Sequence, residues 1–278
     1  RGLLAFLPTA LTLRRRRYDV ALVPHPSLRS ALLAFLSGAP TRVGFDRNAG
    51  RWLYTDVVPY DRALHEVRRN LRLLEPFGRL PEGLRPELFP TSQDRERVEM
   101  LLGDVGDRFA AVAPGSVWPT KRWLPERFAQ VCRWLAERHG LRCVVIGGAD
   151  DSTLAGHVAG LSGGAAVNLA GRLTPLQSAE VVRRARVLVT NDTAPLHMAS
   201  AVGTPVVAVF GPTVPEFGFG PYGVPNRVAQ VELPCRPCAP HGGKRCPLGT
   251  FACMRELSAE HVYRLVVQLL EETEREPA

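Results

Sequence analysis

The sequence has no long apolar run, no signal-peptide pattern and few aromatic residues. Its longest apolar stretches, such as Val206 to Phe210, are far shorter than the roughly 18 consecutive apolar residues of a membrane span. The opening segment lacks the charged start, apolar run and small-residue cleavage site of a signal peptide. Aromatic residues make up 7% of the chain and form no patch interleaved with basic residues, which argues against a nucleic-acid-binding module. We expect a globular, cytoplasmic protein.

The six cysteines do not form the framework of a small disulfide-rich protein. Four of them lie between Cys235 and Cys253, while Cys132 and Cys143 fall in apolar elements of a 278-residue chain. Disulfide scaffolds are usually much shorter, so we expect reduced thiols and a reducing compartment. The first residue is Arg1 rather than Met, and we interpret the chain as lacking its true N-terminus.

Basic residues outnumber acidic residues by 35 to 27, which gives a formal net charge of +8. This balance favours acidic partners such as phosphates, nucleic acid or an anionic membrane face, without choosing among them. The run Arg14 to Arg17 is most simply a solvated segment, and contact with an anionic membrane surface is the alternative. At about 150 residues per domain, the length predicts two domains.

Short apolar runs alternate with helical patterns along the chain. The expected strands are residues 18–23, 41–45, 109–113, 142–146, 187–190 and 206–210. The expected helices are residues 28–36, 64–77, a stripe from 128 to a stop at 140, 175–185 after a capping box at Thr174, 195–201 and a segment capped by Ser258. Strands that are unbroken apolar runs are typical of parallel sheets covered on both faces, so we expect an α/β fold.

The segment Gly78–Pro90 is rich in proline and glycine, and we interpret it, with the helix that follows, as the approach to a domain boundary. We expect a partial N-terminal domain over residues 1–90 and a second domain over 91–257. The second domain includes a cysteine-rich loop at 234–254, and a C-terminal helix occupies 258–278.

Polar and glycine-rich turns follow the strands of the second domain, at the edge where α/β sheets bind ligands. Ser116 and Lys121 follow one strand, and Gly147–Gly148 follows the next. Asn191–Asp192–Thr193 begins a helix, whose free N–H groups and dipole suit a phosphate. The alternatives are plain helix capping, a solvated lysine and a tight glycine turn. Lys121 together with the helix start favours a shared anion site.

Several of these motifs resemble those of the family 9 glycosyltransferases, the bacterial lipopolysaccharide heptosyltransferases. The matching stretches are VAPGSVWPTKRWLPERF at 112–128, VVIGGADD at 144–151 and VLVTNDTAPLHMASAVGTPVVAVFGPT at 187–213. Two further stretches, LVPHPSLRSALLAFLSGAPTRVGF and CRPCAPHGGKRCPLGTFACM, resemble the heptosyltransferase II branch. The resemblance implies a GT-B architecture, in which two Rossmann-like domains with parallel sheets face one another across a cleft. It implies that the C-terminal domain holds ADP-L-glycero-β-D-manno-heptose.

The resemblance also implies roles for individual residues. Ser116, Lys121, Thr193 and Ala194 would hold the diphosphate, and Asp192 would contact the heptose. His197 would lie close behind, although a buried, hydrogen-bonded histidine is the alternative. Asp151 is a candidate for the ribose. Transfer in the family inverts the anomeric centre without metal or other cofactor, so these protein groups would stabilise the departing ADP.

For the acceptor side, the resemblance implies an aspartate base in an early loop of the N-terminal domain that this sequence does not contain. His25 and Arg29 are candidates for contact with the acceptor, and ordinary loop and helix-surface roles are the alternatives. The implied acceptor is an anionic, lipid-linked core oligosaccharide met at the inner membrane face.

The cysteine-rich loop carries Cys235, Cys238, Cys246 and Cys253. Four thiolates are compatible with a structural zinc ion, but the spacing matches no zinc-finger pattern, and free or partly paired thiols are the alternative. Two other functions stay open from the residues alone: a GT-B-type sugar-nucleotide epimerase and a basic nucleic-acid-binding module.

Overall fold

The computed structural model describes residues 6–275, and these residues divide into two compact units between Leu84 and Arg85. The division lies within the segment Gly78–Pro90 that the sequence marks as the approach to a boundary. Each unit has its own parallel sheet and its own core, and each is described separately below.

The first unit is built on a three-stranded parallel sheet in the order β1-β2-β3. Its strands are β1 (Val20–Val23), β2 (Thr41–Phe45) and β3 (Asp56–Val58), and its helices are α1 (Phe6–Arg15), α2 (Leu28–Leu36) and α3 (Glu66–Arg72). Helix α2 begins where Ser27 Oγ accepts a hydrogen bond from Ser30 N at 3.2 Å. Its Ala31 and Ala34 are buried, because this face of the helix packs on β1.

The second unit contains a six-stranded sheet in which every pair of neighbours is parallel. The strands are β4 (Phe109–Ala113), β5 (Arg142–Val145), β6 (Ala166–Asn168), β7 (Val187–Asn191), β8 (Val206–Val209) and β9 (Asn226–Ala229). Their order is β6-β5-β4-β7-β8-β9, so the chain winds outward from β4 and then starts again on its other side at β7. This order is that of dinucleotide-binding folds, whose ligands lie where the winding reverses.

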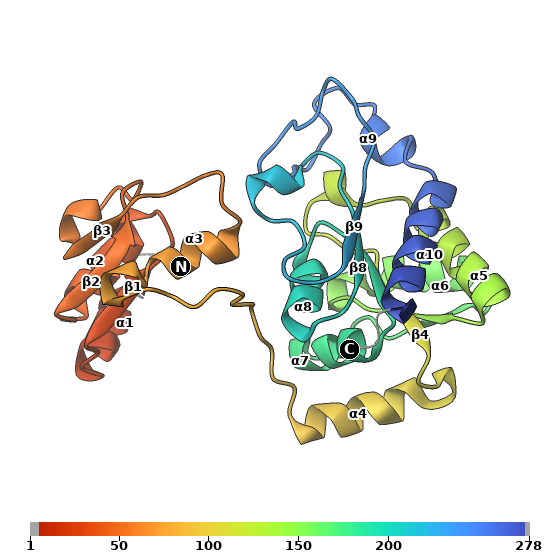
Figure 1. The fold of residues 1–278 in the computed structure, drawn as a ribbon, viewed down its shortest axis with the longest axis horizontal. Helices are drawn as coiled ribbons and strands as arrows, with labels where there is room; N and C mark the ends of the chain where they lie inside the picture. Colours follow the sequence, from red (N-terminus) through yellow and green to blue (C-terminus); the bar gives the residue numbers. More distant parts are fainter. Residues whose placement is uncertain (1–5, 276–278) are drawn as a thin grey trace. The chain divides into compact units, whose positions relative to one another are not determined.

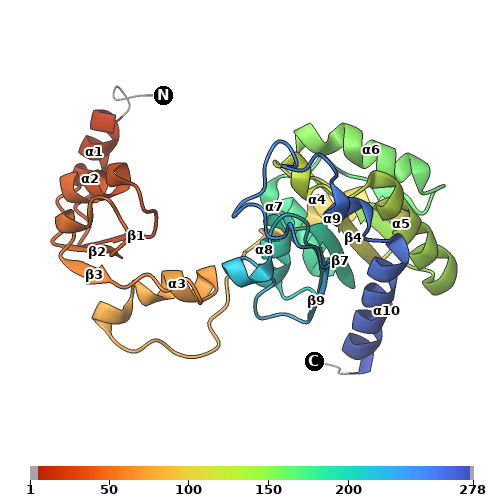
Figure 2. The same ribbon diagram turned by 90° about the horizontal axis from the view of Figure 1, so that it is seen from above.

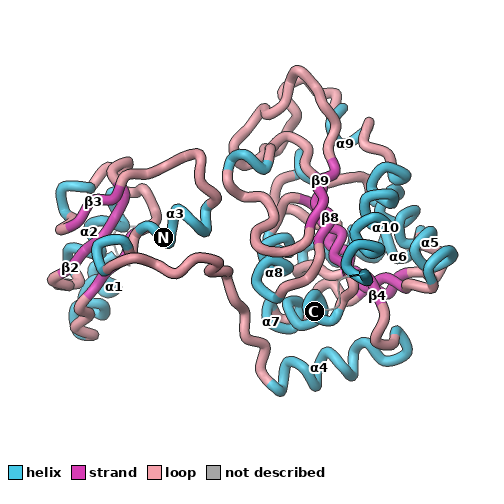
Figure 3. Tube along the Cα trace, in the orientation of Figure 1, coloured by secondary structure: helices cyan, strands magenta, loops and turns pink. Residues whose placement is uncertain are grey.

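Helices cover both faces of this sheet (Figures 1 and 2). On one face lie α5 (Pro125–His139), α6 (Ser152–Leu161) and α10 (Ala259–Arg275), and on the other lie α4 (Ser92–Leu102), α7 (Pro175–Arg184) and α8 (Ala194–Val202). Strands β4, β7 and β8 are buried throughout, which explains why their sequences are apolar without alternation. The long connection after β9, interrupted by α9 (Ala252–Arg255), is mostly loop (Figure 3).

The structure confirms the α/β class and most of the expected elements. The capping box of α7 is present, because Thr174 N donates to Gln177 Oε1 at 3.0 Å and Gln177 N donates to Thr174 Oγ1 at 3.2 Å. Ser258 Oγ accepts from His261 N at 3.1 Å as α10 begins.

One expectation for the first unit needs correction. The helix expected over residues 64–77 is shorter, because α3 ends at Arg72 and a separate 3-10 turn covers Glu75–Phe77 around Pro76. The run Arg14–Arg17 is exposed throughout, as expected of a solvated segment, and Arg14 and Arg15 form the last turn of α1, where a positive charge complements the helix dipole.

Candidate functional site

The turns after β4 and β7 meet at the point where the winding of the second sheet reverses. Ser116 and Lys121 follow β4, and Asp192 and Thr193 follow β7, the strand that pairs directly with β4. The carboxyl ends of neighbouring parallel strands meet at one edge, so these four residues share one side of the sheet.

A buried ion pair links the two turns. Lys121 Nζ lies 2.6 Å from Asp192 Oδ2, and the two side chains are 11% and 6% exposed. The same carboxylate oxygen accepts a hydrogen bond from Thr213 Oγ1 at 2.7 Å. Lys121 is one of only two lysines among the 35 Lys and Arg residues of the chain. The Asp192 carboxylate thus fixes the Lys121 ammonium group at this edge, and the Thr213 hydroxyl holds the carboxylate in turn.

Helix α8 begins beside this pair and has no side-chain cap. Thr193 occupies the N-cap position, but its hydroxyl lies 3.5 Å from Asn191 O instead of binding an N–H of the first turn. Pro195 in that first turn carries no N–H group. No side-chain acceptor of the described residues therefore occupies the positive end of this helix, which argues against simple side-chain capping as the reason for the Asp-Thr sequence.

Asn191 holds the two turns together. Its buried side chain donates from Nδ2 to Pro114 O at 2.8 Å, and its Oδ1 accepts from Trp123 N at 3.1 Å. The segment that carries Lys121 is therefore fastened on both sides to the end of β7. Removal of this side chain would leave buried polar groups without partners.

The turns after β4 and β5 contain glycines that make room for Asp151. A Cβ atom on Gly115 would lie 2.4 Å from the Asp151 carboxylate, and one on Gly147 would lie 2.8 Å from Asp151 Cβ. The carboxylate accepts a hydrogen bond from Gly148 N at 3.1 Å. A side chain at either position would therefore displace Asp151, so these glycines allow the close approach of its carboxylate.

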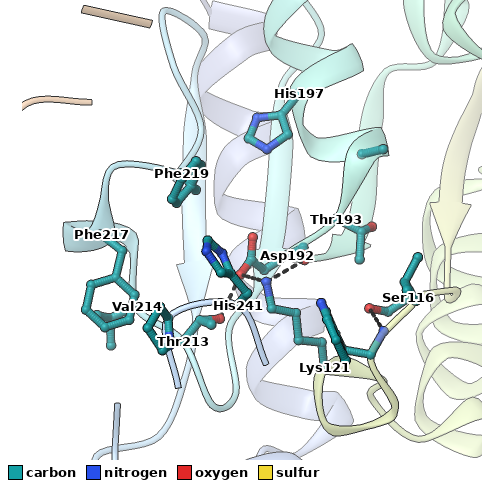
Figure 4. Close-up of a pocket in the computed structure, with 14 residues that line it drawn as sticks. Ser116, Lys121, Asp192, Thr193, His197, Thr213, Val214, Phe217, Phe219 and His241 are labelled. Carbon is teal, nitrogen blue, oxygen red and sulfur yellow. Dashed lines mark hydrogen bonds and ion pairs between the residues drawn. The ribbon is translucent and has the colours of Figure 1, made fainter. Parts of the chain in front are cut away.

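Two adjoining cavities of about 320 Å³ each occupy this edge and share Ser116, Val117, Thr193 and Ala194 as a common wall. The first also contains Lys121, Asp192 and His197 (Figure 4). The second is more apolar and contains Asp151 with Ile146, Leu173, Pro175 and Met198. Together they resemble a site with one charged and one largely apolar compartment.

All seven residues that the sequence singled out for the donor side line one or both cavities: Ser116, Lys121, Asp151, Asp192, Thr193, Ala194 and His197. The two acceptor-side candidates belong to the first unit. His25 is exposed after β1, where its Nδ1 accepts from Ser27 N at 3.3 Å, and it borders a cavity of about 410 Å³. Arg29 is exposed on α2, with its guanidinium 5.8 Å from the centre of the Phe6 ring.

Sequence reasoning assigned no role to a second group of residues that line the first cavity: Trp118, Thr213, Val214, Phe217, Phe219, Pro240 and His241. Thr213 follows a predicted strand, and its position after β8 was a usable signal. His241 lies in the cysteine-rich loop, and only the return of that loop to the cavity reveals it.

The cysteine-rich loop, residues 234–254, contains free thiols in this structure. Among residues 6–275, no three histidine, cysteine, aspartate or glutamate side chains are arranged to hold a metal ion. The loop is fastened instead by Arg236, whose guanidinium donates to the carbonyl oxygens of Gly211, Val231 and Thr213. Burial lowers the pKa of Arg236. Backbone carbonyl groups of these three residues therefore hold Arg236 in place.

The thiols of the loop differ in their titration. Burial raises the pKa of Cys253 and of Cys238. Backbone hydrogen bonds, foremost one involving Phe251, lower the pKa of Cys246. Cys246 is therefore the thiol most readily ionised among these three.

No helix within the described residues has the length and apolarity needed to span a membrane.

Comparison with known proteins connects this arrangement to a family. The sequence profile of glycosyltransferase family 9 (heptosyltransferase) matches residues 9–250. The chain belongs to glycosyltransferase family 9. Lipopolysaccharide heptosyltransferase 2 of Escherichia coli K12 is 28% identical over 238 residues, covering 74% of this chain and 63% of that protein. Lipopolysaccharide heptosyltransferase 1 of Pseudomonas aeruginosa is 29% identical over 228 residues, covering 80% and 62%. The matched region thus spans less than two thirds of these curated relatives.

Solved structures of family 9 members share the fold. The family 9 glycosyltransferase of Veillonella parvula superposes with a TM-score of 0.82 at 24% identity, over 98% of this chain and 80% of that one. Heptosyltransferase II of E. coli superposes with a TM-score of 0.77 at 25% identity, over 95% and 80%. The E. coli heptosyltransferase WaaC with ADP gives a TM-score of 0.72 at 17% identity, over 95% and 77%.

Proposed function

We propose that this chain is a heptosyltransferase of lipopolysaccharide core synthesis, and that its second unit binds the donor ADP-L-glycero-β-D-manno-heptose. The observation that carries the proposal is the buried Lys121–Asp192 pair beside the uncapped start of α8, at the point where the winding of the sheet reverses. A fixed cation and a helix N-terminus are suited to the two negative charges of a sugar-nucleotide diphosphate.

In this proposal the donor lies along both cavities. The more apolar second cavity takes the nucleoside, with the Asp151 carboxylate accepting a hydrogen bond from the ribose. The diphosphate lies at the shared wall, near Ser116, Lys121 and the backbone N–H groups of Thr193 and Ala194. The heptose extends into the first cavity toward Asp192 and His197.

The chemistry assigned to this site is displacement of ADP with inversion at the anomeric carbon. An acceptor hydroxyl oxygen bonds to the anomeric carbon as the bond from that carbon to the diphosphate oxygen breaks. The hydroxyl proton passes to a general base, and negative charge develops on the departing diphosphate. Lys121 and the N-terminus of α8 stabilise that charge in place, so the proposed reaction needs no metal ion. Lys121 then exchanges part of its interaction with Asp192 for the phosphate oxygens, and Asp192 is free to accept hydrogen bonds from the sugar.

The acceptor in this proposal is an anionic, lipid-linked core oligosaccharide at the inner face of the cytoplasmic membrane. The net charge of +8 and the exposed Arg14–Arg17 segment favour such a partner. His25, just after β1, and Arg29 on α2 are proposed to contact it, with the two units forming the halves of a GT-B architecture. Membership of family 9 favours this function over an epimerase or a nucleic-acid-binding module.

Binding measurements test the donor class directly. Titration calorimetry of the chain with ADP, UDP and single-stranded DNA should show binding of ADP and little heat with the other two. Lys121→Ala should weaken ADP binding about tenfold or more, because a charge-assisted hydrogen bond contributes roughly 1.5 kcal/mol or more. Equal binding of UDP, or ADP affinity unchanged by the substitution, would contradict the proposal.

A further inference from the structure

The cysteine-rich loop returns to the first cavity and is fastened on two sides of it. Gly243 N donates to Thr120 Oγ1 at 2.8 Å, and Thr120 N and Oγ1 donate to Gly243 O at 3.2 and 2.9 Å. Cys238 N donates to Pro212 O at 3.0 Å. Thr120 precedes Lys121 and Pro212 precedes Thr213 in the sequence. The loop is therefore hydrogen-bonded next to both residues that bind the Asp192 carboxylate.

Between these anchors the loop backbone packs against the lysine side chain. Gly242 has a φ of +83°, and a Cβ atom there would lie 3.0 Å from Lys121 Cγ, 3.1 Å from Trp118 Cβ and 3.2 Å from Lys121 Cε. Such distances are tighter than ordinary van der Waals contacts. The glycine therefore lets the loop lie directly on the stem of Lys121 and limits where its ammonium group can go.

The preceding residue, His241, contributes its side chain to the cavity itself. Its imidazole ring packs edge-on to Phe219, with 5.9 Å between ring centres and 63° between planes. His241 lines the same cavity as Asp192 and Lys121, and Figure 4 shows the three side chains in that cavity. His241 lines the first cavity and does not line the second.

We infer that the cysteine-rich loop is part of the donor site, in which His241 binds the end of the donor that carries the second phosphate and the sugar. Gly242 is a positioning residue that acts through Lys121. This inference rests on the proposed function of the two cavities. A ring N–H of His241 donates to the second phosphate, and the contact with Phe219 orients the ring for it. The nucleoside and the first phosphate lie outside its reach.

Comparison of ADP with AMP tests the role of His241, because AMP lacks the second phosphate. His241→Ala should weaken ADP binding about three- to tenfold, the range of one hydrogen bond, and leave AMP binding within about twofold. His241→Gln, which keeps an N–H donor, should recover part of the loss. The matched control is His157→Ala, an exposed histidine on α6, which should change neither affinity.

A second pair of variants tests the loop contact. Gly242→Ala and Gly249→Ala both place alanine at a positive φ in the same loop, but a Cβ at Gly249 meets nothing within 4 Å. Both variants should lose similar stability, and only Gly242→Ala should weaken ADP binding by about threefold or more. Melting temperatures measured alongside identify any variant that fails to fold.

The outcomes separate the inference from the proposed function. If the unmodified chain binds no ADP, the proposed function fails first. If it binds ADP through Lys121 but His241→Ala leaves ADP affinity unchanged, or weakens ADP and AMP equally, the inference about the loop is wrong. Equal ADP affinities of Gly242→Ala and Gly249→Ala would overturn the positioning role of Gly242.

Discussion

Replacing Lys121 with methionine separates the structural role of its charge from its binding role. The substitution keeps a long apolar side chain but leaves the Asp192 carboxylate, whose side chain is 6% exposed, with the hydrogen bond from the Thr213 hydroxyl. Removal of one partner of a buried ion pair costs about 3 kcal/mol or more, and the retained hydroxyl keeps the expected loss near the lower end. Urea unfolding should therefore show a free energy of unfolding lower by about 3 kcal/mol.

The double variant Lys121→Met/Asp192→Asn should recover most of that stability. An amide keeps an oxygen for Thr213 and removes the unpaired charge, so the double variant should unfold within about 1 kcal/mol of the original chain. ADP binding, in contrast, should stay weakened about tenfold or more, because no cation remains for the diphosphate. The double variant should therefore regain stability without regaining affinity for ADP.

The control for both measurements is Lys244→Met. Lys244 is the other lysine of the chain and is exposed in the cysteine-rich loop, so its replacement should shift stability by less than about 0.5 kcal/mol. A double variant as unstable as Lys121→Met, or one that binds ADP as tightly as the original, would refute the assignment of the pair.

Two further predictions concern the glycines and the thiols. In Gly115→Ala the new Cβ would lie 2.4 Å from the Asp151 carboxylate, so calorimetry should show weaker binding of both adenosine and ADP. The control is Gly160→Ala on α6, where a Cβ meets nothing within 4 Å. This control should stabilise the chain by about 0.5–1 kcal/mol. The pKa of Cys246 is lowered and that of Cys253 is raised, so at pH 7 to 8, below the ordinary thiol pKa, the thiolate fraction is greater at Cys246. Mass spectrometry after brief iodoacetamide treatment should find Cys246 alkylated before Cys253, and the reverse order would contradict the assignment.

Sequence patterns predict the central strands of the second unit well, because β4, β5, β7 and β8 are unbroken, mostly apolar runs and helices follow β4 and β7. They do not reveal β6 and β9, at Ala166–Asn168 and Asn226–Ala229. These are short edge strands, and their structure depends on pairing with β5 and β8 rather than on their own composition. Helix α1 was not predicted either, because Ala10 is the one residue of this helix that is buried and its sequence shows no broad apolar stripe.

In the candidate site, too, some residues are predictable from local sequence and others depend on tertiary contacts. Ser116, Lys121, Asp192 and Thr193 stand directly after strands, so the topology of an α/β fold places them from sequence alone. His241 reaches the cavity through hydrogen bonds between Gly243 and Thr120, which are 123 residues apart. No local pattern encodes such a contact, because it depends on how a loop packs after the sheet has formed.

The residues that line the first cavity lie far apart in the sequence, and this affects the order in which the cavity forms during synthesis. The polypeptide emerges from the ribosome from its N-terminal end, and Lys121 and the strands through β8 precede Gly243 by many residues. The sheet can therefore assemble while the cavity still lacks the wall that the cysteine-rich loop provides. A nascent chain that has emerged only as far as β9 lacks both the loop and helix α10, which packs on β7, β8 and β9. Such a chain should retain ADP poorly, and tight retention should appear only after the residues beyond Gly243 have emerged and folded.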